Sequence, residues 1–566
     1  MSILDKPKIL ALAVGKGVRN VKRKSYSGMT SLTGFSTYVP DQLEIAPQDL
    51  RTADPTLVQE FYNGRYHIAD RRLETAGKEL FQVHLDDDAM VAALHSFGWL
   101  RHLSASSDAL AGNFARALVK DWLENHSNAK SDIVWNIETV SYRLIYWLCH
   151  SIVITSGAEH EFYRQFMRQI GAHIRYLRRH VSNVADGMPR LLANIALGYA
   201  FVCQPLKNKV LQGSLSRLGQ ELDRQILADG VHISRNPTAI VEILALLLPL
   251  REGCKTRDIV PPEELIRAID RMIPALRMFR MGDGNLARFN GSGVVEHDLV
   301  VTILRYDENS SEALSEASAS GFQRMAMGKS ILLLDVGEAP KGEVSTKACA
   351  SCMAFEFSHN TDCIIVNCGT PSPSFPAETQ VWRSSAAHST VVLNDTSSAK
   401  FESGKTIGRL MNGEIFSANL NVKVDRDDNL DEITVVASHE GYLREFGAVH
   451  QRILQLSDDG NVLRGQERFT GPNGEKMRYT IRDAAVLHFH LHPEVKASPN
   501  VDGQGCIIEA RSGERWFLSC PGFEVKLEES IFFARLAGPC PIWQINISAN
   551  VCKTPEINWT LQRLDS

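Results

Sequence analysis

The segment Asp229-Gly-Val-His232-Ile-Ser-Arg235-Asn236-Pro237 gathers residue types that can hold an anion. Arg235 carries a planar guanidinium, which can meet a carboxylate through two hydrogen bonds. His232 can exchange a proton near neutral pH, and Asn236 can add a hydrogen bond from its amide. The structural alternative is a turn in which Asn236 caps the following helix. Both interpretations stay open at this point.

Three histidines alternate with apolar residues in His488-Phe-His490-Leu-His492. On a strand this spacing puts all three imidazoles on one face. Neighbours two apart on one strand rarely converge on a single metal ion without help from another strand. The pair Cys349 and Cys352 lacks a second pair at zinc-site spacing. We therefore favour structural or ligand-facing use of the histidines and do not assign the cysteines to a zinc site.

Helices must position the first of these segments. From about residue 85 to 280, apolar residues recur at helical spacing. This pattern predicts helices over 90–103, 133–154, 159–180, 189–202, 211–227, 238–250 and 262–278. So many helices in series must pack on one another, closing into a toroid or stacking as a solenoid. No fixed sequence period is present, which favours the toroid.

Strands must position the second group. Turn-forming residues crowd 281–293, and after about residue 320 short β-rich runs follow one another. The predicted strands are 330–336, 353–357, 363–367, 390–393, 433–437, 451–456, 486–492 and 516–519. Without helices between them, the strands should be antiparallel and stacked as two sheets. The sequence thus predicts an α+β multidomain protein, with a helical domain followed by an antiparallel β-sandwich.

We divide the chain into a basic flexible arm at 1–45, a helical toroid at 46–280, a linker and start of the sandwich at 281–320, and the sandwich at 321–566. Residues 1–24 carry seven basic residues against Asp5 alone. The apolar run at 9–14 is too short for a signal-peptide core. We expect this arm to contribute little to folding.

Composition limits the possible partners. The chain has 566 residues, 44% of them apolar, and a formal net charge of −5, so no general basic field attracts nucleic acid. No run of about 18 apolar residues predicts a transmembrane segment. The eleven cysteines are odd in number and follow no disulfide framework, which predicts a cytoplasmic protein, with the periplasm as the alternative. A homodimer is left open.

Seven segments resemble the heparinase II/III-like polysaccharide lyases. They are 94–101, 228–237, 353–357, 365–369, 382–391, 439–442 and 488–493, and they occur in family order. The resemblance implies a helical toroid, a β-sandwich and cleavage of an acidic polysaccharide or oligosaccharide, such as a glycosaminoglycan, by β-elimination at a uronic acid. That reaction needs neutralisation of the sugar carboxylate, a base for the C5 proton and an acid for the leaving oxygen.

The resemblance suggests which residues would do this work. The candidates for catalysis are His232, Arg235, Arg190 and His388, and those for substrate binding are Asn236, Tyr442 and Lys347. We expect Arg190, His232, Arg235 and His388 to meet in one cleft between the domains. Arg190 is equally compatible with a surface position, and Tyr442 with a packing role.

The chain departs from the family at several positions. The family's Asn-His pair, Tyr, two strand histidines and metal-binding Asp fall on Pro189-Arg190, Ala239, Lys347, Cys349 and Asn367. Only His388 is kept among the metal ligands. A divalent ion such as zinc or calcium would then be held by His388, Cys349 and Asn367, a poor donor set for zinc.

Three functions follow from these departures. The first is a lyase with an altered site, in which His232 is the base. The second is a glycan-binding or polysaccharide-assembly protein that kept the fold and lost the chemistry. The third is a hydrolase on the same toroid, which needs a pair of carboxylates. No such pair stands out in the sequence.

Overall fold

The computed structural model describes residues 39–69, 71–127, 133–205, 208–307, 310–372, 375, 380–401, 414–417, 420–477 and 484–564. The basic segment 1–24 lies outside these residues. The last part of the predicted arm, residues 39–45, is not a free chain. The backbone N–H of Glu44 donates to the carbonyl of Cys203 at 2.9 Å, and Leu43 and Ile45 pack on the helical core. Residues 39–45, predicted as the end of the flexible arm, therefore lie against the helical domain.

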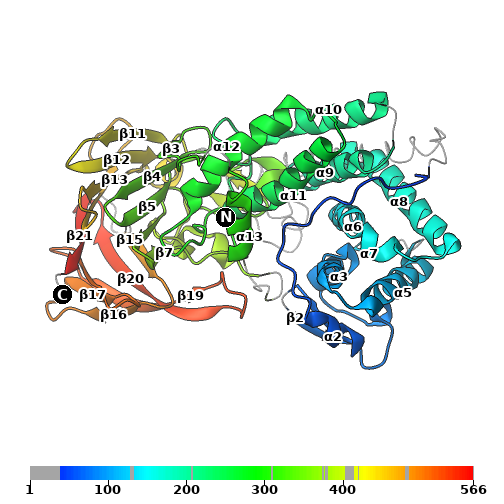
Figure 1. The fold of residues 1–566 in the computed structure, drawn as a ribbon. Helices are drawn as coiled ribbons and strands as arrows, with labels where there is room; N and C mark the ends of the chain where they lie inside the picture. The colour runs from blue at the N-terminus through cyan, green and yellow to red at the C-terminus, as the bar shows by residue number, and fades with distance from the viewer. Residues whose placement is uncertain are drawn as a thin grey trace.

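The N-terminal domain is a series of helices that follow one another around an arc (Figure 1). They are α2 (Leu57–Tyr62), α3 (Asp88–Ser96), α4 (Leu100–Ala105), α5 (Ala109–His126), α6 (Ile137–Cys149), α7 (Ser151–Thr155), α8 (His160–His180), α9 (Met188–Val202), α10 (Asn208–Gln225), α11 (Pro237–Thr256), α12 (Glu263–Phe279) and α13 (His297–Leu304). A hairpin of β1 (Arg65–Ile68) and β2 (Arg71–Glu74) accompanies α2. Helix α6 contacts α3, α8 and α9, and α9 also contacts α10 and α11, so the helices share one core.

Local signals set the helix ends. The side chains of Asp87, Asn136 and Asn236 accept hydrogen bonds from the first turns of α3, α6 and α11, as N-caps do. Two predicted helices are each broken into two. Phe97, with φ of 65°, ends α3 in a left-handed conformation, and His150 separates α6 from α7.

The C-terminal domain consists of two antiparallel sheets (Figure 1). The first sheet has the order β11 (Lys423–Asp428), β12 (Glu432–His439), β13 (Val449–Ser457), β14 (Val462–Thr470), β21 (Glu556–Leu564), β18 (Arg515–Ser519), β17 (Gly505–Glu509) and β16 (Lys496–Pro499). The second has the order β19 (Val525–Phe532), β20 (Cys540–Asn550), β15 (Ala484–Leu491), β7 (Asp362–Val366), β6 (Phe355–His359), β5 (Ser330–Asp335), β4 (Phe322–Met327) and β3 (Glu316–Ala317), with β8 (Val391–Leu393) paired to β15. A small pair, β9 (Lys400–Phe401) and β10 (Ile415–Ser417), lies apart from both.

Side-chain alternation explains the sandwich core. Along β13 every second residue is buried, from His450 through Arg452 and Leu454 to Leu456. The buried Glu467 on β14 binds His450 at 2.7 Å and Arg452 at 2.8 Å. Burial opposes ionisation of Glu467, but Arg452 and His450 hold its pKa below the usual value.

One glycine is needed to close this core. A Cβ at Gly465 of β14 would lie 2.0 Å from Cε2 of Trp559 on β21. Only glycine lets the indole lie across the strand, where its N–H donates to Glu467 at 3.2 Å. Trp559 also stacks on Phe355 with ring centroids 5.9 Å apart, which ties the two sheets together.

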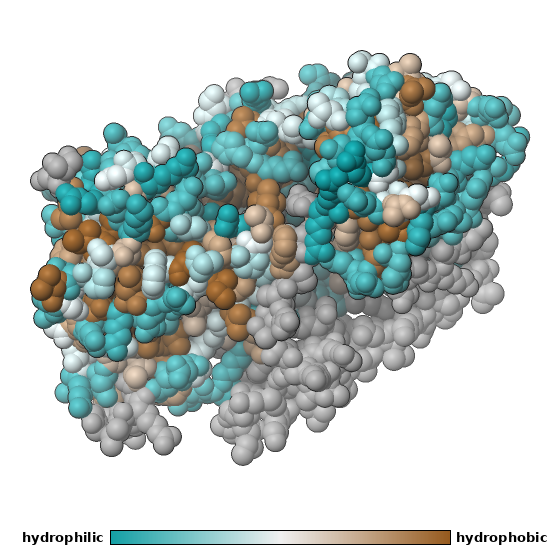
Figure 2. All heavy atoms as spheres, turned by 90° about the horizontal axis from the view of Figure 1, so that it is seen from below, coloured by the Kyte–Doolittle hydropathy of each residue, from teal (hydrophilic) through white to brown (hydrophobic). Residues whose placement is uncertain are grey.

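Strand β11 forms one edge of the first sheet and is highly charged. Its Lys423, Asp425, Asp427 and Asp428 are exposed. Arg426 reaches across to the second sheet, where it donates to the carbonyls of Ser315 and Arg324 at 3.0 and 3.1 Å. On the face shown in Figure 2, which is seen from below, hydrophobic and hydrophilic residues are interspersed.

The predicted fold class is confirmed: a helical domain precedes an antiparallel sandwich. The range 281–320, predicted as a linker and the start of the sandwich, contains helix α13 and strand β3 of the second sheet. Within the described ranges, no helix is long and apolar enough to cross a membrane. All eleven cysteines are free thiols.

Candidate functional site

Arg235 joins the helical domain to the sandwich. Its side chain is buried and forms an ion pair with the buried Asp335 at the end of β5. The guanidinium also donates to three carbonyls, those of Ser320 at 2.5 Å, Gly321 at 3.1 Å and Glu338 at 3.1 Å. Its centre lies 4.6 Å from the ring of Phe322. The carboxylate that Arg235 meets is within the protein, so Arg235 is a clamp between the domains in this structure. Its predicted role in binding a sugar carboxylate stays a prediction.

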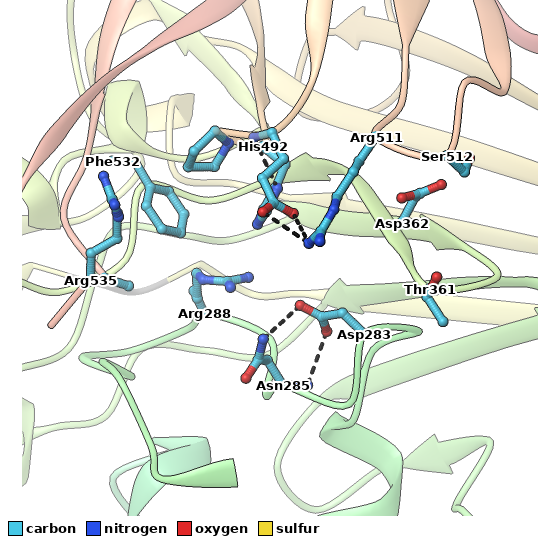
Figure 3. A pocket seen from close by; sticks show the side chains of 13 residues that line it. Asp283, Asn285, Arg288, Thr361, Asp362, His492, Arg511, Ser512, Phe532 and Arg535 are labelled. Atoms are coloured by element: carbon cyan, nitrogen blue, oxygen red, sulfur yellow. Dashed lines mark hydrogen bonds and ion pairs between the residues drawn. The ribbon is translucent and has the colours of Figure 1, made fainter. Parts of the chain in front are cut away.

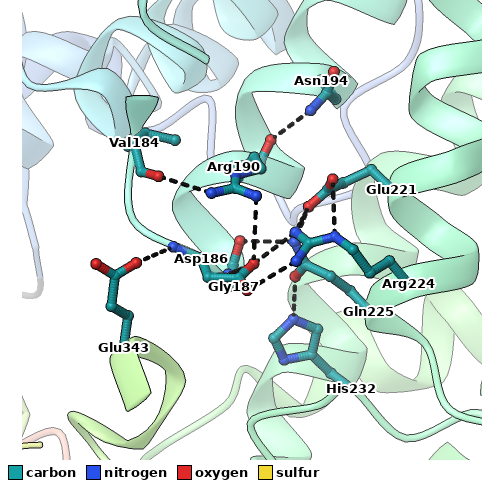
Figure 4. Close-up of polar contacts among 10 residues, drawn as sticks. All are labelled: Val184, Asp186, Gly187, Arg190, Asn194, Glu221, Arg224, Gln225, His232 and Glu343. Atoms are coloured by element: carbon teal, nitrogen blue, oxygen red, sulfur yellow. Dashed lines mark hydrogen bonds and ion pairs between the residues drawn. The ribbon is translucent and has the colours of Figure 1, made fainter. Parts of the chain in front are cut away.

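His232 and Arg190 lie in one hydrogen-bond network (Figure 4). Fully buried, His232 contacts Oε1 of Gln225 through Nε2 at 2.7 Å and Oγ of Ser234 through Nδ1 at 2.8 Å. Gln225 donates in turn to the carbonyl of Gly187 at 3.1 Å. Burial lowers the pKa of His232 to about 4, so the ring is neutral at pH 7. Both ring nitrogens are engaged within the protein, and the role of His232 as a base stays a prediction.

The half-buried Arg190 supports the loop before α9. Its Nη2 donates to the carbonyl of Val184 at 3.1 Å, and Nη1 lies 3.9 Å from Asp186. Asp186 pairs more closely with Arg224, at 2.6 Å, and its backbone N–H donates to Glu343 of the sandwich domain at 2.8 Å. This network, like the Arg235 clamp, connects the two domains.

Two predicted residues of the sandwich, Tyr442 and His388, are enclosed. The hydroxyl of Tyr442 donates to the carbonyl of Val391 at 2.7 Å, and burial raises its pKa well above the usual value. The Nδ1 of the buried His388 hydrogen-bonds the carbonyl of Ser384 at 2.8 Å, and burial lowers its pKa to about 4. Asn236 caps α11 through Thr238, as the structural alternative predicts.

The residues predicted for a metal site fit a divalent ion poorly. Burial raises the pKa of the Cys349 thiol to about 12, which disfavours the thiolate that zinc needs. The side-chain oxygen of Asn367 already accepts the N–H of Ser389 at 2.9 Å. Among the residues that the structure describes, no three or more His, Cys, Asp or Glu are grouped to hold a metal. The zinc or calcium site remains a prediction without support from this geometry.

Lys347 has neighbours that the sequence did not reveal. It is exposed, two residues after the short helix η4 (Gly342–Ser345), and interacts electrostatically with Glu138 on α6 and Glu242 on α11. Both glutamates reach solvent, but the surrounding protein removes much of their hydration. This desolvation raises the pKa of each carboxyl, and Lys347 opposes the rise.

A row of side chains on α6 extends this group. Glu138, Tyr142 and Tyr146 are spaced by four residues and so share one helix face. Tyr142 stacks on Tyr146 with centroids 5.7 Å apart, and Arg51 lies 3.9 Å from the Tyr146 ring. Burial raises the pKa of Tyr142 well above the usual value, and Glu242 adds to the rise. Helical spacing could have found the α6 residues; it could not have shown that Glu242 lies near them.

Comparisons with known proteins agree with this architecture. Residues 309–560, most of the sandwich, match the family model described as heparinase II/III-like, C-terminal. The whole chain has the heparinase III fold: a crystal structure of heparinase III aligns with a TM-score of 0.71 at 12% identity, covering 96% of this chain and 89% of that one. The heparan sulfate lyase HepC of Pedobacter heparinus gives a TM-score of 0.61 at 16% identity, covering 99% and 91%.

A curated relative is similar over most of its length. FtsZ-localized protein C of Caulobacter vibrioides is 29% identical over 511 residues, which cover 88% of this chain and 87% of that protein. The predicted resemblance to the heparinase II/III family is thus confirmed, while the relative's name refers to a place in the cell and not to a reaction.

Proposed function

We propose that this protein binds glycans on a lyase scaffold and does not cut uronic acids by β-elimination. The observation that supports this best is the group of Lys347, Glu138 and Glu242. Elimination builds negative charge on the uronate, which a site must offset with cations or hydrogen-bond donors. Two glutamates and one lysine together carry more negative than positive charge, so this group would oppose the build-up of negative charge on the uronate. Lys347 also stands where the resemblance places a family histidine.

The state of the other candidates supports the same proposal. The guanidinium of Arg235 is committed to Asp335 and three carbonyls. His232 and Tyr442 are buried and hydrogen-bonded within the protein. The rival function, β-elimination on an acidic glycan with His232 as base, requires that the ring leave both of its hydrogen bonds. Under that rival, His232→Gln lowers turnover by about 100-fold.

An absorbance assay separates the two functions. We would incubate the protein with heparan sulfate, hyaluronan, chondroitin sulfate and alginate and follow the absorbance of the unsaturated uronate. We expect no rise with the parent protein. A matched variant, Lys347→His, tests whether the family residue type at this position is enough to restore activity. A rise with the parent that His232→Gln abolishes would establish the lyase and contradict our proposal.

We also infer that the protein acts at FtsZ. The basis is its 29% identity, over 88% of the chain, to a protein named for its localisation to FtsZ. This agrees with the cytoplasmic location predicted from the scattered cysteines. Sedimentation with FtsZ filaments tests it, with unassembled FtsZ as the control. We expect the protein to pellet when FtsZ filaments are present and to stay in the supernatant with unassembled FtsZ. A protein that stays in the supernatant in both samples would contradict the inference. So would a fluorescent fusion that spreads evenly through the cell or enters the periplasm.

A further inference from the structure

A polar cavity of about 920 Å³ opens where the segment between α12 and α13 meets the sandwich (Figure 3). Five separate stretches of the chain line it, namely 283–288, 361–362, 492–494, 511–512 and 532–535. A second cavity of about 130 Å³ shares Asn285, Arg288 and Ala534 with the first and continues to His297 at the start of α13. The two cavities adjoin at these residues, and we call them together the groove; the volume of the larger cavity is within the range of ligand sites.

Most cations of the groove are already neutralised. Arg288 pairs with the buried Glu356 at 3.2 Å, and Arg511 pairs with Glu494 at 3.2 Å. Burial lowers the pKa of His492 to about 4, so this ring carries no charge at pH 7. Two further carboxylates, Asp283 and Asp362, then face one further cation, Arg535. An anionic ligand gains little from this balance of charges.

The carboxylate of Asp362 in the groove lacks a hydrogen-bond partner. It begins β7, is only 8% exposed, and its Oδ2 is buried without a hydrogen-bond partner. Strand pairing of β7 with β6 and β15 fixes its position. Buried acceptors are almost always satisfied, so an unsatisfied carboxylate oxygen at a cavity points to a donor supplied by a ligand. Thr361 and Ser512 lie beside it and offer further hydroxyls (Figure 3).

We propose that this groove binds an uncharged oligosaccharide, with Asp362 accepting hydrogen bonds from sugar hydroxyls. Hydroxyl groups both donate and accept, which suits a wall that alternates Asp283, Asn285 and Asp362 with Arg288 and Arg535. The cavity of about 920 Å³ leaves room for more than one sugar unit. A metal ion is disfavoured, because no metal-binding group is found among the described residues. This site is additional to the one around Lys347 and does not depend on it.

Calorimetric titration with two uncharged probes, cellopentaose and N-acetylchitopentaose, tests the groove, with a heparin pentasaccharide as the acidic comparison. We expect at least one uncharged probe to bind the full-length protein. Asp362→Ala removes a charged hydrogen-bond acceptor and should weaken that binding by about 10-fold or more. The matched control is Asp427→Ala, which removes an exposed carboxylate on β11 and should leave binding unchanged.

Arg535→Ala is a second variant, because Arg535 is exposed and its loss spares the fold. It should also weaken binding. The inference is overturned if neither uncharged probe binds, if the heparin probe binds more tightly than both and loses this binding in Asp362→Ala, or if Asp362→Ala and Arg535→Ala bind as the parent does. Lys347→Gln separates the two sites. It should leave binding in the groove unchanged, because Lys347 does not line the cavity. If no uncharged probe binds in the groove, the function proposed for the Lys347 site is unaffected.

Discussion

The clamp around Arg235 and the groove around Asp362 are both polar and both lie between the domains, yet they differ in completeness. At the clamp Nε, Nη1 and Nη2 of Arg235 all donate within the protein, to Asp335 or to backbone carbonyls. At the groove a carboxylate oxygen is unpaired beside about 920 Å³ of open volume. The comparison shows that the type of a residue suggests what it could bind. A hydrogen-bonding group left without a partner indicates where a ligand could bind.

Breaking the clamp should have the largest effect. Arg235→Met leaves the carboxylate of Asp335 buried without its cation, and removal of one partner of a buried pair costs about 3–5 kcal/mol. We expect the free energy of unfolding, measured by urea denaturation, to fall by about this amount. The matched control is Arg267→Met, which breaks an exposed pair with Asp223 and should leave the unfolding midpoint nearly unchanged. Equal midpoints for the two variants would show that Arg235 is no clamp.

Acid should weaken the interior next. The pKa of His232 and of His388 is lowered to about 4 in the folded protein, against about 6.5 when unfolded. Between these values the unfolded chain binds protons that the folded chain does not, so stability falls as the pH falls from 6.5 towards 4. At pH 5 the loss is about 2 kcal/mol for each histidine. Thermal unfolding of His232→Gln between pH 7 and 5 should show a smaller decline than the parent; an identical decline would contradict the shift.

Changing the charge near Lys347 should alter which glycans bind. Glu242→Gln removes a carboxylate and should strengthen binding of a heparin pentasaccharide by about 5-fold at low salt, and Lys347→Gln should weaken it by a similar factor. Both changes in affinity should be smaller at high salt, because dissolved ions screen the interaction between the charges. Calorimetry at two salt concentrations measures this. Equal affinities for the parent and both variants would show that Lys347 does not contribute to glycan binding.

The smallest effect on stability is expected at the groove. Asp362 has no partner for its Oδ2, so Asp362→Asn breaks no hydrogen bond of that atom. We expect its free energy of unfolding to stay within about 1 kcal/mol of the parent. A loss as large as that of Arg235→Met would make Asp362 part of the architecture and erase the contrast between the two regions.

Local patterns predicted most of the fold. The runs 330–336 and 451–456 are β5 and β13, because alternation is a property of neighbours along the chain. Helices α8, α9 and α12 likewise begin and end within about two residues of the prediction. The break at Phe97 was missed, since a left-handed residue that is not glycine leaves no compositional signal. The break at His150 was also missed, although this residue has φ of −103° and is not left-handed.

The candidate site was harder to predict because its contacts are distant in sequence. Arg235 was recognised as a residue that binds carboxylates, but its partner Asp335 is 100 positions away. Glu138 and Glu242 come from different helices, and the lining of the groove comes from five stretches. Such pairings depend on how the domains pack, and no local spacing encodes them.

The charged strand β11 has a consequence for how copies of this protein meet. An exposed sheet edge can recruit a strand from another molecule and start aggregation. Here a second copy added parallel and in register would set Lys423, Asp425, Asp427 and Asp428 each beside the same residue of its neighbour. Parallel extension of the sheet through this edge is therefore disfavoured by repulsion between like charges.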